Sequence, residues 1–529
     1  MTIPTRTYTS YEPKWGHFYL QNNSNKNNST SKNNTSSHQN HPYARQYNHV
    51  YSRRLDSLRE RCLENANVTL KSAHDTSTSV IQVPRIIELK EDVLCTIVGT
   101  IVKDTPGRPV VDTDYQSSSL YKYNTSKDDD PMTLQPLRTY ASDEKDVLVL
   151  EDESGRVELL SHSDKDTLQA YKMVTGMVVA VTGIVQGNTG VMEVSHVHYP
   201  MLAPQKTSLP KPISVSSPCI MLLSGLHCGS PGSANDLESS LSLKRGMLAD
   251  YIAGHITPND DAAHISRLII AGGGCDRPQN FPNEEDDENN ASAPSFSSKK
   301  KNTPNPFIQS MNYAIQELDL FISEICSSGI PTDLIPGLHD PTNANFPQQP
   351  LHSCVLPHSS SFGEELFQRT TNPYAADIGN ALIMGSDGRN VINVRRFTYD
   401  SAKITNADKN EKAEIPMISC LDALEQTLRC SHIAPTAPDS LHCYPFYDED
   451  PFVIEECPNI YFAGNCPAFE SKLIEGKSGS GDQKTTCRLI CVPSFAETGE
   501  VVLVNLDTLD CECISFTDIS DTSDKDMEE

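Results

Sequence analysis

The sequence lacks long hydrophobic runs and has few aromatic residues. No stretch of its 529 residues approaches 18 uninterrupted apolar residues, and the opening MTIPTRTYTSYEPKWGHFYL has no apolar signal-peptide core. Aromatic residues make up 7% of the chain, with a single tryptophan. From these absences we expect a soluble protein that neither spans a membrane nor is secreted.

Positive charge is also scarce. The 43 lysines and arginines face 70 aspartates and glutamates, which gives a formal net charge of −27. Such a charge repels phosphate backbones and anionic membranes at long range, although a local basic patch is compatible with it. We therefore expect no membrane partner and no general affinity for nucleic acid.

The 16 cysteines show neither a dense disulfide framework nor paired CxxC motifs. Two close pairs exist, Cys487 with Cys491 and Cys511 with Cys513, and both lie in apolar, strand-like surroundings. We expect most of the cysteines to be buried thiols in a reducing compartment.

Three common enzyme motifs are missing. The sequence contains no GxxxxGK[ST] phosphate loop, no spaced GxGxxG and no GxSxG nucleophile turn. It does contain IIAGGGCD at 269–276, where an apolar run stops at three glycines. Glycines in this position either cradle a phosphate on exposed N–H groups or mark a tight turn.

The N-terminal part divides into three regions. Residues 1–42, which include an asparagine-rich insert at 21–40, are expected to be disordered. Residues 43–84 are expected to form a helical segment, because apolar residues recur there at three- and four-residue intervals. Residues 85–205 show about five short strand patterns separated by turns, which predicts a small OB-type β-barrel.

The predicted barrel strands carry almost no Phe, Trp or Tyr and many acidic residues. Barrels that bind single-stranded nucleic acid need stacked aromatic side chains over a basic groove. A barrel that docks onto protein is therefore the favoured interpretation, with nucleic-acid binding as the alternative.

The larger C-terminal part follows a proline-containing linker at 202–212. From 213 to 516 buried-type strands alternate with amphipathic helices, interrupted by a charged insert at 277–305, and an acidic tail occupies 517–529. The expected fold class is therefore a multidomain α+β and α/β protein with disordered inserts.

Five motifs in this part follow a recognisable order. They are SGLHCGS (224–230), AGGGCD (271–276), PGLHDP (336–341), CSHIAP (430–435) and AGNCPAF (463–469). The order and context of these motifs resemble those of the calcineurin-like metallophosphoesterases. The motifs of that family are, in chain order, DxH, GDxxD, GNH with an acid, a lone His, and GHxH. The resemblance covers about residues 215–515 and implies a β-sandwich flanked by helices, with two metal ions that activate water.

The metal ligands of that family are largely replaced here. His227 keeps the histidine of DxH, and His432 matches the lone histidine. Asp276 matches the outer acid of GDxxD, which the resemblance does not make a metal ligand, and the third motif retains His339 and Asp340. The other ligand positions fall on Gly225, Gly273 (the bridging carboxylate), Leu338, Asn465 and Pro467.

Two metal ions need hard anionic ligands, above all a bridging carboxylate. We therefore expect no binuclear site, no cofactor and no catalytic residue in this chain. One metal hypothesis remains, a single zinc ion held by His227, His339 and His432. The alternative interpretation, which we favour, is that these three histidines are structural.

A barrel followed by a phosphoesterase-like domain without metal ligands resembles the small accessory subunits, the B-type subunits, of the eukaryotic replicative DNA polymerases. The delta-type small subunits (subunit 2) are most similar. The strings that carry this resemblance are YARQYNHVYSRRL (43–55), LAPQK (202–206), DPTNANFPQQPLH (340–352), GSDGRNV (385–391) and HIAPTAPDSLHCYPFYDEDPFVIEECPNIYFAGNCPAF (432–469).

The resemblance implies a nuclear, non-catalytic scaffold in DNA replication and repair. Such a scaffold binds the cysteine-rich C-terminal domain of the catalytic subunit and the N-terminal domain of a third subunit. It meets the sliding clamp and DNA only indirectly, and the iron–sulfur cluster of the complex belongs to the catalytic partner. The alternatives are a working metal-dependent phosphodiesterase and the corresponding small subunit of polymerase alpha or epsilon.

Overall fold

The computed structural model describes twelve segments of the chain. They are residues 9–20, 46–73, 80–108, 139–142, 146–161, 167–205, 218–229, 237–256, 260–276, 306–403, 415–478 and 483–516. The asparagine-rich insert (21–40), the charged insert (277–305) and the acidic tail (517–529) lie outside the described residues.

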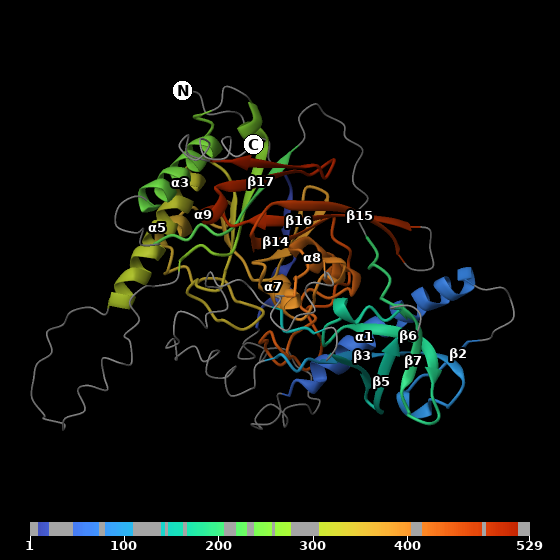
Figure 1. Ribbon diagram of the computed structural model, residues 1–529. Coiled ribbons are helices and arrows are strands. Elements are labelled where there is room, and N and C mark those ends of the chain that lie inside the picture. The colour runs from blue at the N-terminus through green and yellow to red at the C-terminus, as the bar shows by residue number, and fades with distance from the viewer. Residues whose placement is uncertain are drawn as a thin grey trace, which may run out of the picture.

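The N-terminal unit is a closed β-barrel, lower right in Figure 1. Its long strand β3 pairs with both β4 and β6, so the sheet closes on itself and leaves no long open edge there. Two short 3-10 helices, η3 (Ile86–Glu88) and η4 (Ala170–Lys172), connect the strands. The strands are β2 (Ile81–Gln82), β3 (Leu94–Asp104), β4 (Val147–Asp152), β5 (Gly155–Ser161), β6 (Val178–Val185) and β7 (Met192–His198).

Helix α1 (Asn48–Ala73) packs against this barrel and lies within the segment 43–84 that we expected to be helical. Its buried stripe, Leu55, Leu58, Cys62 and Ala66, follows helical spacing and contacts Val98, Val178 and Ala180 of β3 and β6. The expectation was wrong at the end of that segment, where β2 is extended and pairs with β3 in parallel.

The second unit, which we call the body, contains two six-stranded mixed sheets. One sheet has the order β1 (Tyr11–Pro13), β12 (Tyr374–Ile378), β13 (Ala381–Ser386), β14 (Ile460–Cys466), β16 (Gln483–Pro493), β15 (Glu470–Ser478). The other has the order β11 (Phe367–Arg369), β10 (Thr332–Ile335), β9 (Ile265–Ala271), β8 (Cys219–Leu223), β17 (Glu500–Asn505), β18 (Cys511–Ser515).

Both faces of the sheet that contains β8 are buried. Ile220 and Leu222 belong to the core between the sheets, whereas Met221 and Leu223 face the core under the helices, as the period of two along a strand requires. The covering helices on that side are α3 (Leu237–Ala253) and α5 (Pro306–Ser327), at the upper left of Figure 1.

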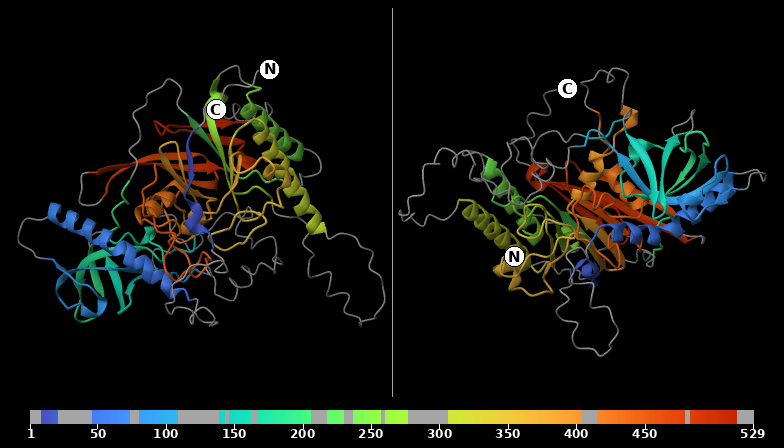
Figure 2. Two further views of the ribbon diagram at one scale, coloured as in Figure 1. Left: turned by 180° about the vertical axis from the view of Figure 1, so that it is seen from behind. Right: turned by 90° about the horizontal axis from the view of Figure 1, so that it is seen from below.

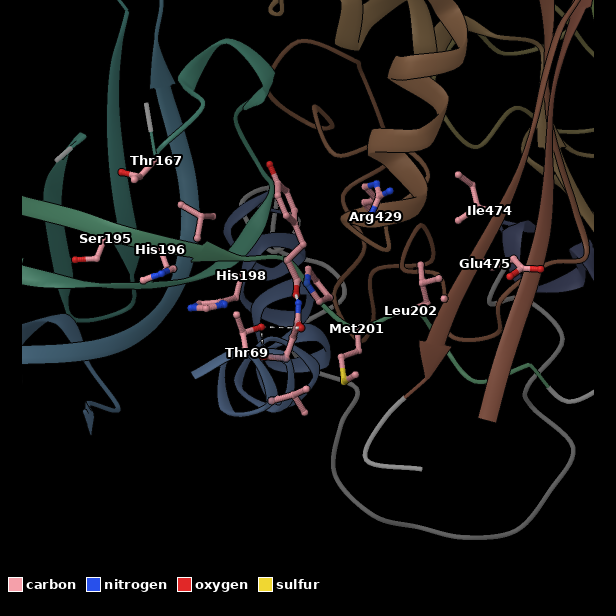
Figure 3. A pocket seen from close by; sticks show the side chains of 16 residues that line it. Thr69, Thr167, Ser195, His196, His198, Met201, Leu202, Arg429, Ile474 and Glu475 are labelled. Carbon is pink, nitrogen blue, oxygen red and sulfur yellow. Dashed lines mark hydrogen bonds between the residues drawn. The ribbon is translucent and has the colours of Figure 1, made fainter. Parts of the chain in front are cut away.

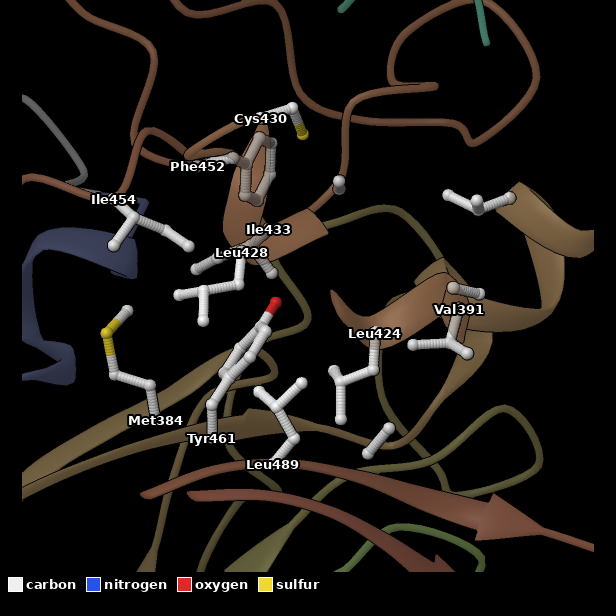
Figure 4. Close-up of a cluster of buried hydrophobic side chains, with 14 of the residues drawn as sticks. Met384, Val391, Leu424, Leu428, Cys430, Ile433, Phe452, Ile454, Tyr461 and Leu489 are labelled. Atoms are coloured by element: carbon white, nitrogen blue, oxygen red, sulfur yellow. The ribbon is translucent and has the colours of Figure 1, made fainter. Parts of the chain in front are cut away.

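Helices α7 (Arg389–Arg396) and α8 (Cys420–Arg429) cover the sheet that contains β14. Figure 4 shows Tyr461 and Leu489 of this sheet pointing toward Leu424 and Leu428 of α8. Ser419 caps α8 by accepting the Asp422 N–H. The remaining short elements of the body are α6 (Pro357–Ser360), α9 (Phe495–Thr498), η1 (Trp15–Phe18), η5 (Asp260–His264) and η6 (Ser401–Lys403).

Residues 9–20 depart from the disorder expected over 1–42. Strand β1 pairs with β12, the Tyr11 ring lies under the Arg267 guanidinium at 3.6 Å, and Trp15 and Phe18 are buried. Figure 2 shows this dark-blue segment lying against the body. Burial of these large aromatic side chains offsets the entropy cost of ordering the segment. The low average hydrophobicity of residues 1–42 conceals this stabilising contribution.

Barrel, α1 and body meet in a joint of buried polar contacts. Arg54 of α1 is fully buried and donates to Asp450 of the body at 2.7 Å. Its guanidinium also donates to the carbonyl oxygens of Gly176, next to the barrel strand β6, and of Pro435 and Ala437 in the body. Because one side chain bonds all three parts, their relative positions are fixed together.

Further bonds cross the same joint. Lys103 of β3 donates to the Phe397 carbonyl at 2.8 Å, and Arg108 pairs with Asp439 at 2.8 Å. Gln205, at the start of the expected linker 202–212, is buried and exchanges two hydrogen bonds with the Thr486 backbone. This end of the linker is therefore packed onto β16, and residues 206–212 lie outside the described residues.

Candidate functional site

The three glycine-containing motifs lie together at one edge of a sheet. Strands β8, β9 and β10 are neighbours and run parallel, so their carboxyl ends meet at one edge of the sheet. SGLHCGS follows β8, AGGGCD begins at the end of β9, and PGLHDP follows β10. We call the described residues of these segments the motif loops. This edge is the usual place for ligands in parallel sheets.

The first two motif loops are hydrogen-bonded directly to each other. Gly225 N–H donates to the Gly272 carbonyl at 3.0 Å, and His227 N–H donates to the Gly273 carbonyl at 2.9 Å. The pairing continues from Cys228 N–H to Gly274 O and from Asp276 N–H back to Cys228 O, both at 2.9 Å. The two backbones therefore close the space between the strand ends.

Side chains at positions 225 and 273, to which the resemblance assigns acids, would be crowded and strained. A Cβ atom on Gly273 would lie 2.7 Å from Asn465 Oδ1 and 2.9 Å from Gly225 Cα, and one on Gly225 would lie 2.5 Å from Ser494 Oγ. Both glycines have φ near +65°, where a side chain is strained. The metal pair that the resemblance implies does not fit these residues.

The AGNCPAF motif contributes a cross-link at this edge. Asn465 donates its backbone N–H to Ser224 Oγ at 2.9 Å and its side-chain amide to the Asp387 carbonyl at 3.0 Å. Its Oδ1 is buried against the two glycines and has no hydrogen-bond partner among the described residues. Pro467, the other expected histidine position, is exposed.

The retained histidines have separate surroundings. His227 is partly exposed, with its Nδ1 3.7 Å from Asp276 Oδ1. Leu338 and His339 are partly buried in the third motif loop. In the part of the chain that the structure describes, no three His, Cys, Asp or Glu side chains are grouped to hold a metal ion.

His432 belongs to the joint between barrel and body. Its Nε2 lies 2.9 Å from Asp450 Oδ2, and its Nδ1 accepts the Ala434 N–H at 3.1 Å, so the ring is neutral with its proton on Nε2. Burial and the Arg54 charge lower the pKa of His432 to about 4. Burial alone would raise the pKa of Asp450, but Arg54 and His432 hold it well below its usual value.

Sequence patterns did not identify this Arg54–Asp450–His432 group. Arg54 stands in the apolar stripe of α1. An arginine at such a position indicates a buried polar contact, because a buried guanidinium must find several acceptors. Its partner Asp450 is 396 residues away in the chain. The buried pair of Asp387 and Arg389, 2.6 Å apart beside the motif loops, was missed for lack of any motif.

A separate groove of about 650 Å³ opens between barrel and body. Figure 3 shows His196 and His198 of the barrel on one side and Arg429, Ile474 and Glu475 of the body on the other. The groove depends on the joint, because neither unit supplies both walls.

Comparison with known families matches both units. Residues 46–197 match the model for the DNA polymerase delta subunit OB-fold domain, and residues 220–471 match that for the B subunit of DNA polymerase alpha/epsilon. The first match covers α1 and the barrel, and the second covers most of the body. The expected OB-type barrel is thereby confirmed.

Whole-chain relatives identify the delta type. The DNA polymerase delta small subunit of Arabidopsis thaliana is 34% identical over 89% of this chain and 91% of its own length. The chain belongs to the family of DNA polymerase delta small subunits. DNA polymerase delta subunit 2 of Drosophila melanogaster is 32% identical over 90% of this chain and 94% of the relative. The small subunit of Saccharomyces cerevisiae is 28% identical over 90% of each chain.

Family membership places the chain among accessory subunits of a replicative polymerase. No helix within the described residues is long and apolar enough to cross a bilayer. The motif loops of this delta-family chain thus lie where parallel sheets bind ligands, and their backbones pair directly at Gly225 and Gly273.

Placing an acid at position 273, where the resemblance puts the bridging carboxylate, is expected to destabilise the protein without creating a metal site. Gly273→Asp meets both backbone strain and steric overlap, whereas Gly190→Asp, at φ +71° with nothing within 4 Å of its Cβ, meets strain alone. We expect Gly190→Asp to cost about 1–2 kcal/mol and Gly273→Asp about 1–3 kcal/mol more, measured by urea unfolding. A rise in Tm of Gly273→Asp on addition of Mn²⁺ would show that a metal site can form.

Acidification is expected to weaken the joint between about pH 6.5 and pH 4. The unfolded chain binds a proton at His432 near its ordinary pKa of 6.5, but the folded chain does so only near 4, so stability falls as pH falls through this window. The loss is about 3 kcal/mol. His432→Gln should flatten the stability–pH curve there, while His442→Gln, at an exposed position, should not. Equal curves for all three proteins would contradict this assignment.

Proposed function

We propose that this chain is the non-catalytic scaffold subunit of a nuclear DNA polymerase delta. It joins the cysteine-rich C-terminal domain of the catalytic subunit to a third subunit, and it acts in replication and in repair synthesis. The sliding clamp and DNA are reached through those partners. Polymerase activity resides in the catalytic subunit.

The observation that carries this proposal is the closed backbone at the motif loops. The carboxyl ends of β8, β9 and β10 are where a phosphoesterase-like body would hold its metals. Here Gly225 and Gly273 stand at acid positions and are packed against each other and against Asn465. This packing supports a role in holding other chains over metal-dependent catalysis.

The joint supports the same proposal. A scaffold needs two surfaces in a fixed relation, and Arg54 with Lys103 fixes barrel and body to each other by buried bonds. The net charge of −27 agrees with a subunit that reaches DNA through partners, because general attraction to the phosphate backbone would be unfavourable.

The competing function is a metal-dependent phosphodiesterase with an aberrant site. Two of the retained motif residues, His227 and Asp276, are partly exposed in the motif loops, where such an enzyme would act. Their 3.7 Å separation is too long for a hydrogen bond.

The bridging role predicts the order in which the complex assembles. The third subunit should co-elute with the full-length catalytic subunit in size-exclusion chromatography only when this chain is present. Each of the two should also form a binary complex with this chain. A stable complex of catalytic and third subunits without this chain, or failure of either binary complex, would contradict the bridge.

The enzymatic alternative is tested separately on the purified full chain. Incubation with Mn²⁺ and a chromogenic phosphodiester should give no turnover above buffer. Metal-dependent turnover that disappears in His227→Ala but persists in His442→Ala would overturn the non-catalytic assignment.

A further inference from the structure

The carboxylate of Asp340, in the third motif loop, is buried and surrounded by backbone N–H groups. Its Oδ2 accepts the Gly337 N–H at 2.6 Å and the Gly274 N–H at 3.4 Å, and its Oδ1 accepts the Cys275 N–H at 2.7 Å. Only 4% of the residue is exposed. The three donors come from two motif loops, those that follow β9 and β10.

Converging backbone N–H groups in a loop form an anion-binding concavity. The location agrees with that use, because the two loops lie at the carboxyl ends of adjacent parallel strands. Burial raises the pKa of Asp340, and hydrogen bonds from the three N–H groups oppose this rise. The side chain therefore fills the position of a bound anion.

The surrounding residues let the N–H groups approach this carboxylate closely. A Cβ on Gly274 would lie 2.9 Å from Leu318 Cδ2 and 3.1 Å from Asp340 Oδ1, and one on Gly337 would overlap the Gly273 nitrogen. Side chains at these two positions would push the loops apart. The glycines of AGGGCD and PGLHDP therefore serve the contact between the loops and the carboxylate.

We propose that the loops after β9 and β10 form an anion-binding cradle whose ligand is the chain's own Asp340 carboxylate. The Asp340 carboxylate holds these two loops together by its hydrogen bonds to both of them. When the Asp340 side chain is shortened, the cradle accepts a small free carboxylate such as formate. This inference is independent of the proposed bridging role.

Chemical rescue of Asp340→Ala tests the proposal. The variant removes the anion and leaves three buried N–H groups without an acceptor, so its Tm should fall well below that of the wild type. Sodium formate at neutral pH should restore more than about half of the Tm loss in a saturable manner, because it binds the folded state alone. Sodium chloride at equal ionic strength should not.

Leu318→Ala is the matched control. It opens a cavity beside the same loop, but the cavity is apolar and offers no N–H donors, so formate should raise its Tm no more than chloride does. Asp340→Asn is a second control, since its amide still fills the cradle and should leave no space for formate.

Two results would overturn the proposal. The first is a Tm of Asp340→Ala that responds equally to formate and chloride. The second result concerns a variant that is insoluble. Refolding of Asp340→Ala from urea should then recover more soluble protein in formate than in chloride, and equal recovery in the two salts would contradict the cradle.

Discussion

The buried Arg54 guanidinium is the interaction on which the rest of the structure depends. An arginine loses its hydration when it is buried, and this cost is offset only if acceptors satisfy its N–H groups. Asp450, Gly176, Pro435 and Ala437 supply those acceptors within 3.0 Å. Because they belong to barrel and body, the requirement to satisfy one charge aligns both units with α1.

The same constraint gives His432 its role. In a phosphoesterase the lone histidine would be a metal ligand, but here its Nε2 proton is committed to Asp450, which also accepts from Arg54. A neutral ring is what this arrangement requires, since a second positive charge beside Arg54 would be unfavourable. The motif residue thus stabilises the joint, while Gly225 and Gly273 seal the sheet edge.

Local patterns in the sequence predicted the elements that depend on near neighbours. The α1 stripe, the short barrel strands and the three motif loops at one sheet edge all follow from periodicity and from strand-to-glycine transitions. The fold of residues 9–20 and the Arg54–Asp450 pair could not be predicted in this way. Both depend on partners hundreds of residues away, such as β12 for β1, and local composition carries no trace of such pairing.

The candidate site was predictable in its location and only partly in its structure. Gly273 stands at the position to which the phosphoesterase resemblance assigns the bridging acid, and on that basis the sequence predicted the loss of metal ligands. The direct pairing of the loops and the burial of the Asp340 carboxylate could not be predicted from the sequence, because an acid retained in a motif carries no information on what it contacts.

Native-state hydrogen exchange of Arg54→Ala beside Arg53→Ala tests the central claim most directly. Arg53 is the neighbouring, half-exposed arginine of α1, so the pair separates loss of the joint from loss of a helix charge. Removing Arg54 leaves Asp450 buried without its cation and should cost about 3–5 kcal/mol. Amide protection should then fall together in β6 of the barrel and in residues 431–454 of the body, and Arg53→Ala should leave both unchanged. Loss of protection confined to one of the two units would show that barrel and body are not held as one by this side chain.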